Sequence, residues 1–83
     1  MGNTLDAVTL YVRARCPLCD EARVELRAVG VAWTEVDVDS EPRLQKLYGA
    51  RVPVIEAGGR VVAEGNLHGV GLGRVLRGDT AGR

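Results

Sequence analysis

The pair of cysteines at Cys16 and Cys19 constrains this chain more than any other feature of its sequence. The chain has 83 residues, and these two are its only cysteines. A disulfide between residues so close together closes a very small loop, so it removes little entropy from the unfolded chain. A stabilising staple is therefore a poor explanation for the pair, and redox or metal chemistry is a better one.

Composition is that of one small globular domain. The chain is 46% hydrophobic and 27% charged, and a chain of this length buries only about 60% of the surface that it exposes when unfolded. We expect a single domain over residues 1–83, with an ordered core at 7–77 and loose ends at 1–6 and 78–83. Eleven basic residues are balanced by eleven acidic ones, which argues against a nucleic-acid binder.

No segment is typical of a membrane protein or of a secreted one. The longest apolar runs are far shorter than the roughly 20 residues of a membrane span, and the start does not resemble a signal peptide. We therefore expect a cytoplasmic monomer that binds neither a membrane nor a nucleic acid.

The alternation of apolar, polar and turn-forming residues predicts an α/β fold. Strands are predicted at residues 7–12, 31–37, 52–57 and 60–64. Helices are predicted at residues 18–29, 41–48 and 72–77. The order is β-α-β-α-β-β-α, in which the first crossover implies a parallel strand pair and the later hairpin, turning at Gly58-Gly59, an antiparallel edge.

Apolar spacing indicates which side chains enter the core. In the first helix, one face is formed by Leu18, Ala22, Leu26 and Val29, while Val24 lies off it. The second helix presents Leu44, Leu47 and Tyr48. The last segment presents Leu67, Val70, Leu72, Val75 and Leu76, although its glycines weaken the start of that helix. The first strand carries no charge, which favours a central strand covered on both faces.

Cys16 lies where the first strand gives way to a helix, and Pro17 suits the first turn of that helix. Unpaired backbone N–H groups and the helix dipole favour a thiolate at such a position, although the dipole alone lowers the thiol pKa by less than about one unit. Arg13 and Arg15 add positive charge. The first sulfur of such a pair tends to be exposed and the second deeper, so Cys16 is the expected attacking thiol and Cys19 the resolving thiol.

Other interpretations of the cysteines remain open at this point. A structural zinc site needs about four ligands, and the only other soft ligand is His68, so zinc would require a dimer. An iron–sulfur cluster or metal held through Cys16 across a dimer is the main alternative function, and two inert core cysteines are another. For Val52-Pro53, an ordinary trans proline at a strand entry is the simplest interpretation of the residues alone.

Several segments together resemble the glutaredoxins. The resemblance rests on residues 9–19 with their Cys-Pro-Leu-Cys motif, on 33–39 as a second strand, and on 51–54 around Val52-Pro53, and it spans nearly all of 7–77. It implies a thioredoxin-like fold of glutaredoxin type, a four-stranded mixed sheet with strand order 2-1-3-4. It also implies thiol–disulfide exchange without a bound cofactor, with glutathione as a frequent co-substrate.

The resemblance also implies roles for individual residues. Cys16 would be the nucleophile and Cys19 the resolving thiol, with Pro53 as a cis-proline facing them. Arg13 matches a basic residue that meets a glutathione carboxylate, and Val52 matches the residue whose backbone pairs with the glutathione cysteine.

Three departures leave the glutathione site incomplete. Leu18 replaces the usual aromatic residue between the cysteines, and Arg51 stands where a threonine commonly precedes Val-Pro. The segment 64–68 lacks the carboxylate that holds the glutathione amine, for which Asn66 is the expected substitute. With these departures, the chain resembles short bacterial glutaredoxin-like proteins more closely than it resembles typical glutaredoxins.

We therefore expect a thiol-disulfide oxidoreductase of cell redox homeostasis and electron transport that acts on protein disulfides or glutathione. Its expected reductant is glutathione or an enzyme like thioredoxin reductase. Arg13, Arg15 and Arg51 are expected to cluster around the thiol and, with Val52, Pro53 and Asn66, to contact the substrate.

Overall fold

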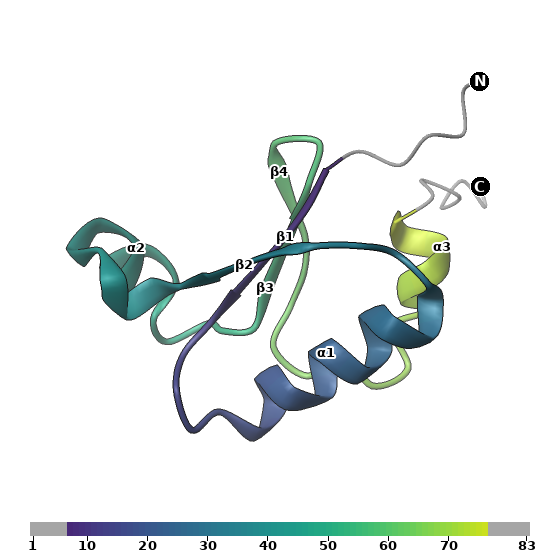
Figure 1. Ribbon diagram of the computed structural model, residues 1–83, viewed down its shortest axis with the longest axis horizontal. Helices are drawn as coiled ribbons and strands as arrows, with labels where there is room; N and C mark the ends of the chain where they lie inside the picture. Colours follow the sequence, from purple (N-terminus) through teal and green to yellow (C-terminus); the bar gives the residue numbers. More distant parts are fainter. Residues whose placement is uncertain (1–6, 77–83) are drawn as a thin grey trace.

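A computed structural model describes residues 7–76 of the chain (Figure 1). Its elements are β1 (Val8–Val12), α1 (Pro17–Val29), β2 (Thr34–Asp37), the short 3₁₀ helix η1 (Val38–Ser40), α2 (Pro42–Tyr48), β3 (Val54–Ala57), β4 (Arg60–Glu64) and α3 (Leu72–Leu76). The predicted order of strands and helices is confirmed. The expectations for residues 1–6 and 77–83 lie outside the described residues. None of the helices within 7–76 is long and apolar enough to cross a membrane.

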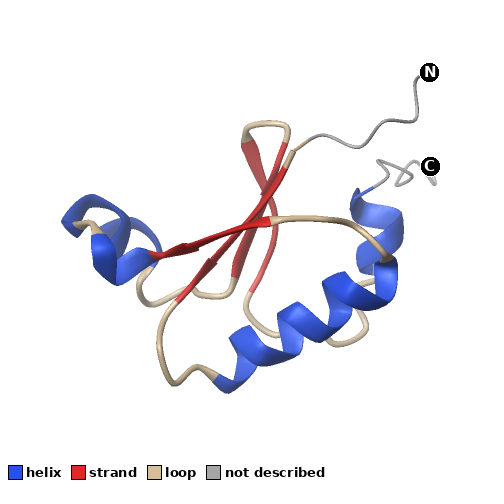
Figure 2. Cartoon of the chain, viewed as in Figure 1, coloured by secondary structure: helices blue, strands red, loops and turns tan. Residues whose placement is uncertain are grey.

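The four strands form one mixed sheet in the order β2-β1-β3-β4, as expected. β1 pairs in parallel with β2 and antiparallel with β3, and β3 pairs antiparallel with β4. The hairpin turns at Gly58 and Gly59, whose φ angles of 64° and 82° lie in the left-handed region that glycine adopts without steric cost. α1 and α3 lie together on one side of the sheet, and α2 stands at the left end of the view (Figure 2).

Two separate groups of buried side chains hold the helices to the sheet. The larger core lies under α1 and α3 and contains Val8, Leu10, Val12, Cys19, Ala22, Leu26, Ile55, Leu67, Leu72 and Leu76. The smaller core lies beside α2 and contains Val38, Tyr48 and Val54, with Tyr11, Leu44 and Val52 packed against it. Since neighbouring residues of a strand point to opposite faces, Leu10 enters the larger core while Tyr11 borders the smaller one.

Five details of the sequence interpretation were wrong. The third strand begins at Val54 rather than residue 52. The second strand begins at Thr34 rather than residue 31, and Val38 leaves it for η1 to be buried in the smaller core. Leu18 is 37% exposed, because the phase of α1 buries Cys19, Ala22 and Leu26 instead.

The other two corrections concern side chains expected in the core. Leu47 is exposed on α2, where Tyr48 provides the buried contact. Val70 is exposed because Gly69 and Gly71 have positive φ angles, so the regular helix begins only at Leu72.

Candidate active site

The segments that carry the predicted site residues meet at one end of the sheet. Tyr11 pairs with Val54 and Val12 with Asp37, so the chain leaves β1 and β2, and enters β3, at the same end. Glu64 also pairs with Val54, so β4 finishes there too. The sheet order therefore brings together residues 13–19, 38–41, 49–53 and 64–66.

Cys16 caps the N-terminus of α1. The chain turns out of β1 through Arg15, whose φ of 55° lies in the left-handed region, and Cys16 is extended with φ −118° and ψ 99°. The backbone N–H of Cys19 donates to Cys16 Sγ at 3.1 Å, so the sulfur takes the place of a capping oxygen. The same N–H is in position to stabilise negative charge on that sulfur when the bond is reduced.

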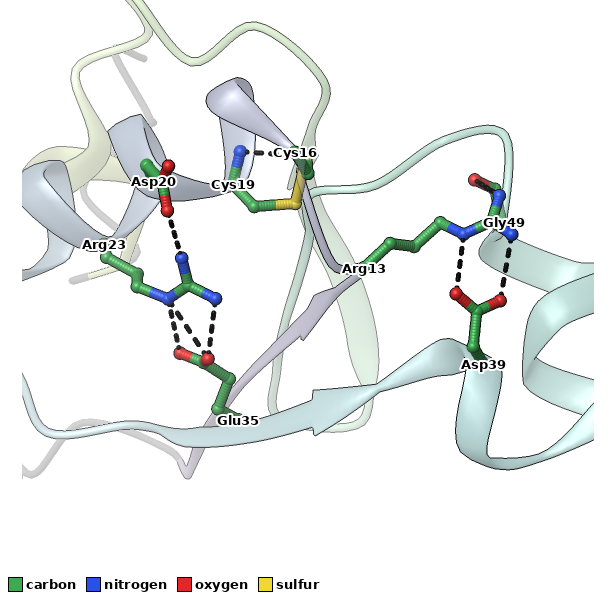
Figure 3. Close-up of a disulfide and its surroundings, with 8 residues drawn as sticks. All are labelled: Arg13, Cys16, Cys19, Asp20, Arg23, Glu35, Asp39 and Gly49. Atoms are coloured by element: carbon green, nitrogen blue, oxygen red, sulfur yellow. Dashed lines mark hydrogen bonds and ion pairs between the residues drawn. A yellow bond between two sulfur atoms is a disulfide. The ribbon is translucent and has the colours of Figure 1, made fainter.

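Cys16 and Cys19 are joined by a disulfide across the first turn of α1, with their Cα atoms 5.2 Å apart (Figure 3). Cys19 is completely buried, whereas Cys16 is half-buried at the edge of the larger core. A partner therefore has access to Cys16 and not to Cys19. This asymmetry matches the one expected for an attacking and a resolving thiol.

Residues 49–53, which we call the docking loop, join α2 to β3 at this end of the sheet. The Val52-Pro53 peptide bond is cis, as the resemblance implied, so the simpler trans interpretation was wrong. Pro53 is buried, and its carbonyl accepts from Gly65 N–H at 2.8 Å. Val52 is half-buried against both cores, and neither its N–H nor its C=O bonds to a residue within 7–76.

Arg13 is held by the protein itself. Its Nε and Nη2 donate to the two Asp39 carboxylate oxygens at 3.1 and 2.9 Å, and its Nη1 donates to the Gly49 carbonyl at 3.0 Å. Gln45 Nε2 donates to the same Asp39 carboxylate. The hydrogen bonds from Arg13, and then from Gln45, hold the pKa of Asp39 below its ordinary value. Figure 3 shows the Arg13 side chain extending away from the disulfide toward Asp39 and Gly49.

Arg51 is held in a similar way. Its guanidinium pairs with the Glu64 carboxylate and lies over the Tyr48 ring, with 5.2 Å from Cζ to the ring centroid. The hydrogen bond from Arg51 lowers the pKa of Glu64. Arg15, by contrast, is exposed, and its side chain forms no hydrogen bond or ion pair with any part of the chain that the structure describes.

Arg13 and Arg51, which were expected to cluster around the thiol, are thus each paired with a carboxylate of the chain. Sequence reasoning missed their partners, Asp39 and Glu64. A signal was present, because each carboxylate stands where a strand ends beside β1 or β3, and the predicted strand order would have placed it at this end of the sheet.

A third compensated arginine lies on the other side of the disulfide. Arg23 of α1 binds Glu35 of β2 through Nε and Nη2, and its Nη1 donates to Asp20 at 2.6 Å. Trp33 Nε1 also donates to Glu35. The hydrogen bond from Arg23 is the main reason that the pKa of Glu35 is lowered.

Two tyrosines share one carboxylate behind the docking loop. Tyr11 and Tyr48 donate to the two oxygens of Glu56 at 3.0 and 3.1 Å, and their ring centroids are 4.8 Å apart. Burial, followed by the hydrogen bond to Glu56, raises the pKa of Tyr11 to about 12. This network fixes Tyr48, and with it the end of α2 from which the docking loop departs.

Asn66, the expected substitute for the carboxylate that holds the glutathione amine, already uses one of its polar groups within the chain. Asn66 Oδ1 accepts from His68 N–H at 3.0 Å, which closes a local turn and leaves only the amide NH₂ for a partner. His68 is exposed. Within residues 7–76, no three His, Cys, Asp or Glu side chains are grouped so that they could hold a metal ion.

Comparisons with known proteins agree with this geometry. The family model described as "Glutaredoxin-like domain (DUF836)" matches residues 7–77. A structural-genomics target protein from X. campestris is 38% identical, over 71% of this chain and 80% of that one, with a TM-score of 0.65. No curated protein matches the chain significantly.

Two structures of lower identity share the fold. Glutaredoxin from Brucella melitensis has a TM-score of 0.70 at 22% identity, over 96% of this chain and 98% of that one. A buckwheat glutaredoxin–glutathione complex has a TM-score of 0.57 at 16% identity, over 71% of this chain and 61% of that one. With the family match over residues 7–77 and the sheet order already described, the chain belongs to the glutaredoxin-like family of the thioredoxin superfamily.

Proposed function

We propose that this protein is a thiol–disulfide oxidoreductase that cycles between a dithiol and the Cys16–Cys19 disulfide. The observation that carries the proposal is that disulfide itself. It spans the first turn of α1, with its half-buried sulfur at the helix N-cap and its other sulfur in the larger core.

In the reduced protein, the Cys16 thiolate attacks one sulfur of a substrate disulfide. A mixed disulfide forms, the substrate S–S bond breaks, and the departing thiolate takes a proton from solvent. The Cys19 thiol then gives up its proton and attacks Cys16 Sγ, which releases the second substrate thiol and leaves the Cys16–Cys19 disulfide. The substrate gains one electron pair, which a thiol reductant restores to the protein.

The docking loop supports this proposal from the substrate side. The N–H and C=O of Val52, which bond to no residue within 7–76, are available to an extended peptide that carries the reacting cysteine. Glutathione is one such peptide, and a buckwheat protein of the same fold forms a complex with it. Glutathione or an enzyme like thioredoxin reductase is the proposed reductant, and protein disulfides are the other proposed partners.

The test uses two single-thiol variants, Cys16→Ser and Cys19→Ser. Both should lose net disulfide reductase activity, because the cycle needs both sulfurs. Only Cys19→Ser should accumulate a mixed disulfide with the substrate, seen as the added mass of one substrate thiol. Failure of Cys19→Ser to form an adduct, or full activity of Cys16→Ser, would contradict the proposal.

Alkylation of the reduced protein over a range of pH measures activation of the thiol. We expect a pKa for Cys16 below the value of about 8.5 of a free cysteine, since the helix N-terminus and Arg15 favour the thiolate. An apparent pKa at or above that value would contradict the mechanism of activation. The absorbance spectrum of aerobically purified protein separates this proposal, which expects a colourless protein, from the cluster-binding alternative.

A further inference from the structure

We propose that Asp39 and Glu64 act as built-in counter-ions, so that the site reacts faster with disulfides in polypeptide segments without acidic groups than with disulfides flanked by carboxylates, such as oxidised glutathione. This inference rests on the proposed oxidoreductase function and specifies its substrate class. It starts from the two arginines that the family resemblance would assign to the substrate, Arg13 and Arg51.

Three of the five N–H donors of Arg13 are already engaged, so a substrate carboxylate that bound its bidentate edge would displace a partner. Asp39 binds the guanidinium through two parallel hydrogen bonds, which is the strongest geometry for an arginine–carboxylate pair. The third nitrogen of that guanidinium is bound to the Gly49 carbonyl. An incoming carboxylate would therefore meet the negative charge of Asp39 and would also loosen the start of the docking loop.

Arg51 presents the same obstacle on the other flank. Its guanidinium is paired with Glu64, contacts the Leu47 carbonyl and covers the Tyr48 ring. Arg51 stands directly before Val52. Because Glu64 neutralises its charge, no net positive charge lies beside the backbone groups of Val52 that are proposed to pair with a substrate. Both arginines thus position the docking loop and contribute no uncompensated charge to it.

Both uncharged and charged groups are exposed beside the disulfide. Leu18 lies between the two cysteines and is 37% exposed, and Val52 offers its side chain and backbone groups that have no partner in the described part of the chain. Of the charged neighbours, Arg15 adjoins Cys16, while Asp20, which is paired with Arg23, and Glu21 follow Cys19. A single solvated cation discriminates weakly between ligands. The positive charge of Arg15 next to Cys16 instead favours the Cys16 thiolate.

The test measures how fast two small disulfides oxidise the reduced protein. Oxidised glutathione carries carboxylates near its disulfide, and bis(2-hydroxyethyl) disulfide is uncharged. Each reaction produces the Cys16–Cys19 disulfide and two thiols, so acid quenching, alkylation and mass measurement give both rate constants. The ratio of the rate with oxidised glutathione to the rate with the neutral disulfide is the quantity compared between variants.

Asp39→Asn should raise this ratio about two- to fivefold, the range expected for one exposed ion pair. The amide keeps the volume and a hydrogen bond to Arg13 but removes the competing charge. The rate with the neutral disulfide should change less than the rate with oxidised glutathione, and the ratio removes any change in docking that the two substrates share. In the double variant Arg13→Gln with Asp39→Asn, the gain should disappear.

Glu41→Gln is the matched control. It makes the same change in net charge two residues away, on an exposed side chain that forms no capping hydrogen bond. If Asp39→Asn leaves the ratio unchanged, or if Glu41→Gln raises it equally, the inference is overturned. If neither disulfide oxidises Cys16, the proposed oxidoreductase function itself fails, and the two failures are thereby distinguished.

Discussion

The larger and the smaller core are held together by different kinds of interaction. The larger core, which includes Cys19, is made of aliphatic side chains and one sulfur. The smaller core supports the docking loop and is surrounded by directional contacts, in which Tyr48 bonds to Glu56 and stacks under Arg51. Apolar packing is insensitive to charge, whereas the second arrangement depends on which groups are ionised.

This difference separates the two halves of the candidate site. The cysteines are placed by α1 and by the shape of the larger core. Val52 is placed by hydrogen bonds and ion pairs that join Arg13 and Arg51 to neighbouring carboxylates. Changes in pH or charge should therefore act on substrate docking before they act on the geometry of the disulfide.

Leu26→Ala should have the largest effect, because Leu26 is completely buried at the centre of the larger core. We expect a loss of about 2–5 kcal/mol in the free energy of unfolding, the range for removing a buried leucine side chain. Denaturant unfolding measures it. Val24→Ala is the control on the same helix, since Val24 is 58% exposed. Equal losses in unfolding free energy for the two variants would contradict the inference that the larger core dominates stability.

Tyr48→Phe should have a smaller effect, about 1 kcal/mol, because it removes one hydrogen bond to Glu56 and keeps the ring. Tyr11→Phe should cost a similar amount. The double variant should depart from the sum of the two, since both hydroxyls share one carboxylate. If denaturant unfolding showed additive costs near zero, the polar network would not stabilise the smaller core.

Alkaline titration of tyrosinate absorbance probes the smaller core alone. The pKa of Tyr11 is raised from 10.0 to about 12, foremost by burial. Because the pKa of Tyr11 is higher in the folded than in the unfolded protein, the protonated Tyr11 hydroxyl contributes stability below about pH 10. That contribution is lost as the pH rises to about 12. Tyr11→Phe should remove the later-titrating group and leave Tyr48, whose pKa is also raised by burial and by Glu56, and Glu56→Gln should shift both titrations to lower pH. A single tyrosine transition near the ordinary value would contradict the network.

Glu35→Gln should have the smallest effect, and it probes the rim of the larger core. Arg23 lowers the pKa of Glu35, so their pairing stabilises the protein above the ordinary carboxyl pKa and loses that contribution as the pH falls. The difference in unfolding free energy between wild type and variant should therefore shrink between about pH 7 and about pH 3. A difference that stays constant with pH would show that the ion pair contributes nothing.

Much of the fold follows from local sequence patterns. The uncharged run before Cys16 predicted the central strand, and Gly58-Gly59 predicted the hairpin, because both signals depend on neighbouring residues. The limits of the second strand could not be read in this way. They are set by the length over which Thr34–Asp37 pairs with β1, which is a tertiary property.

In the candidate site too, local features could be predicted from the sequence and long-range contacts could not. Local rules placed Cys16 at a helix start and made Cys19 the deeper sulfur. The partners of Arg13 and Arg51 lie 26 and 13 residues further along the chain, at Asp39 and Glu64. No local rule connects them, so the count of cations near the cysteines overstated the free positive charge.

The antiparallel pairing of β1 and β3 also has a practical consequence. Val8 pairs with Ala57, so the Gly58-Gly59 turn lies at the end of the sheet opposite the cysteines. Exposed turns of small residues accept insertions readily. A fluorescent reporter or surface tether inserted at this turn would leave the disulfide facing solvent, which makes the hairpin tip a suitable handle for building a redox probe from this protein.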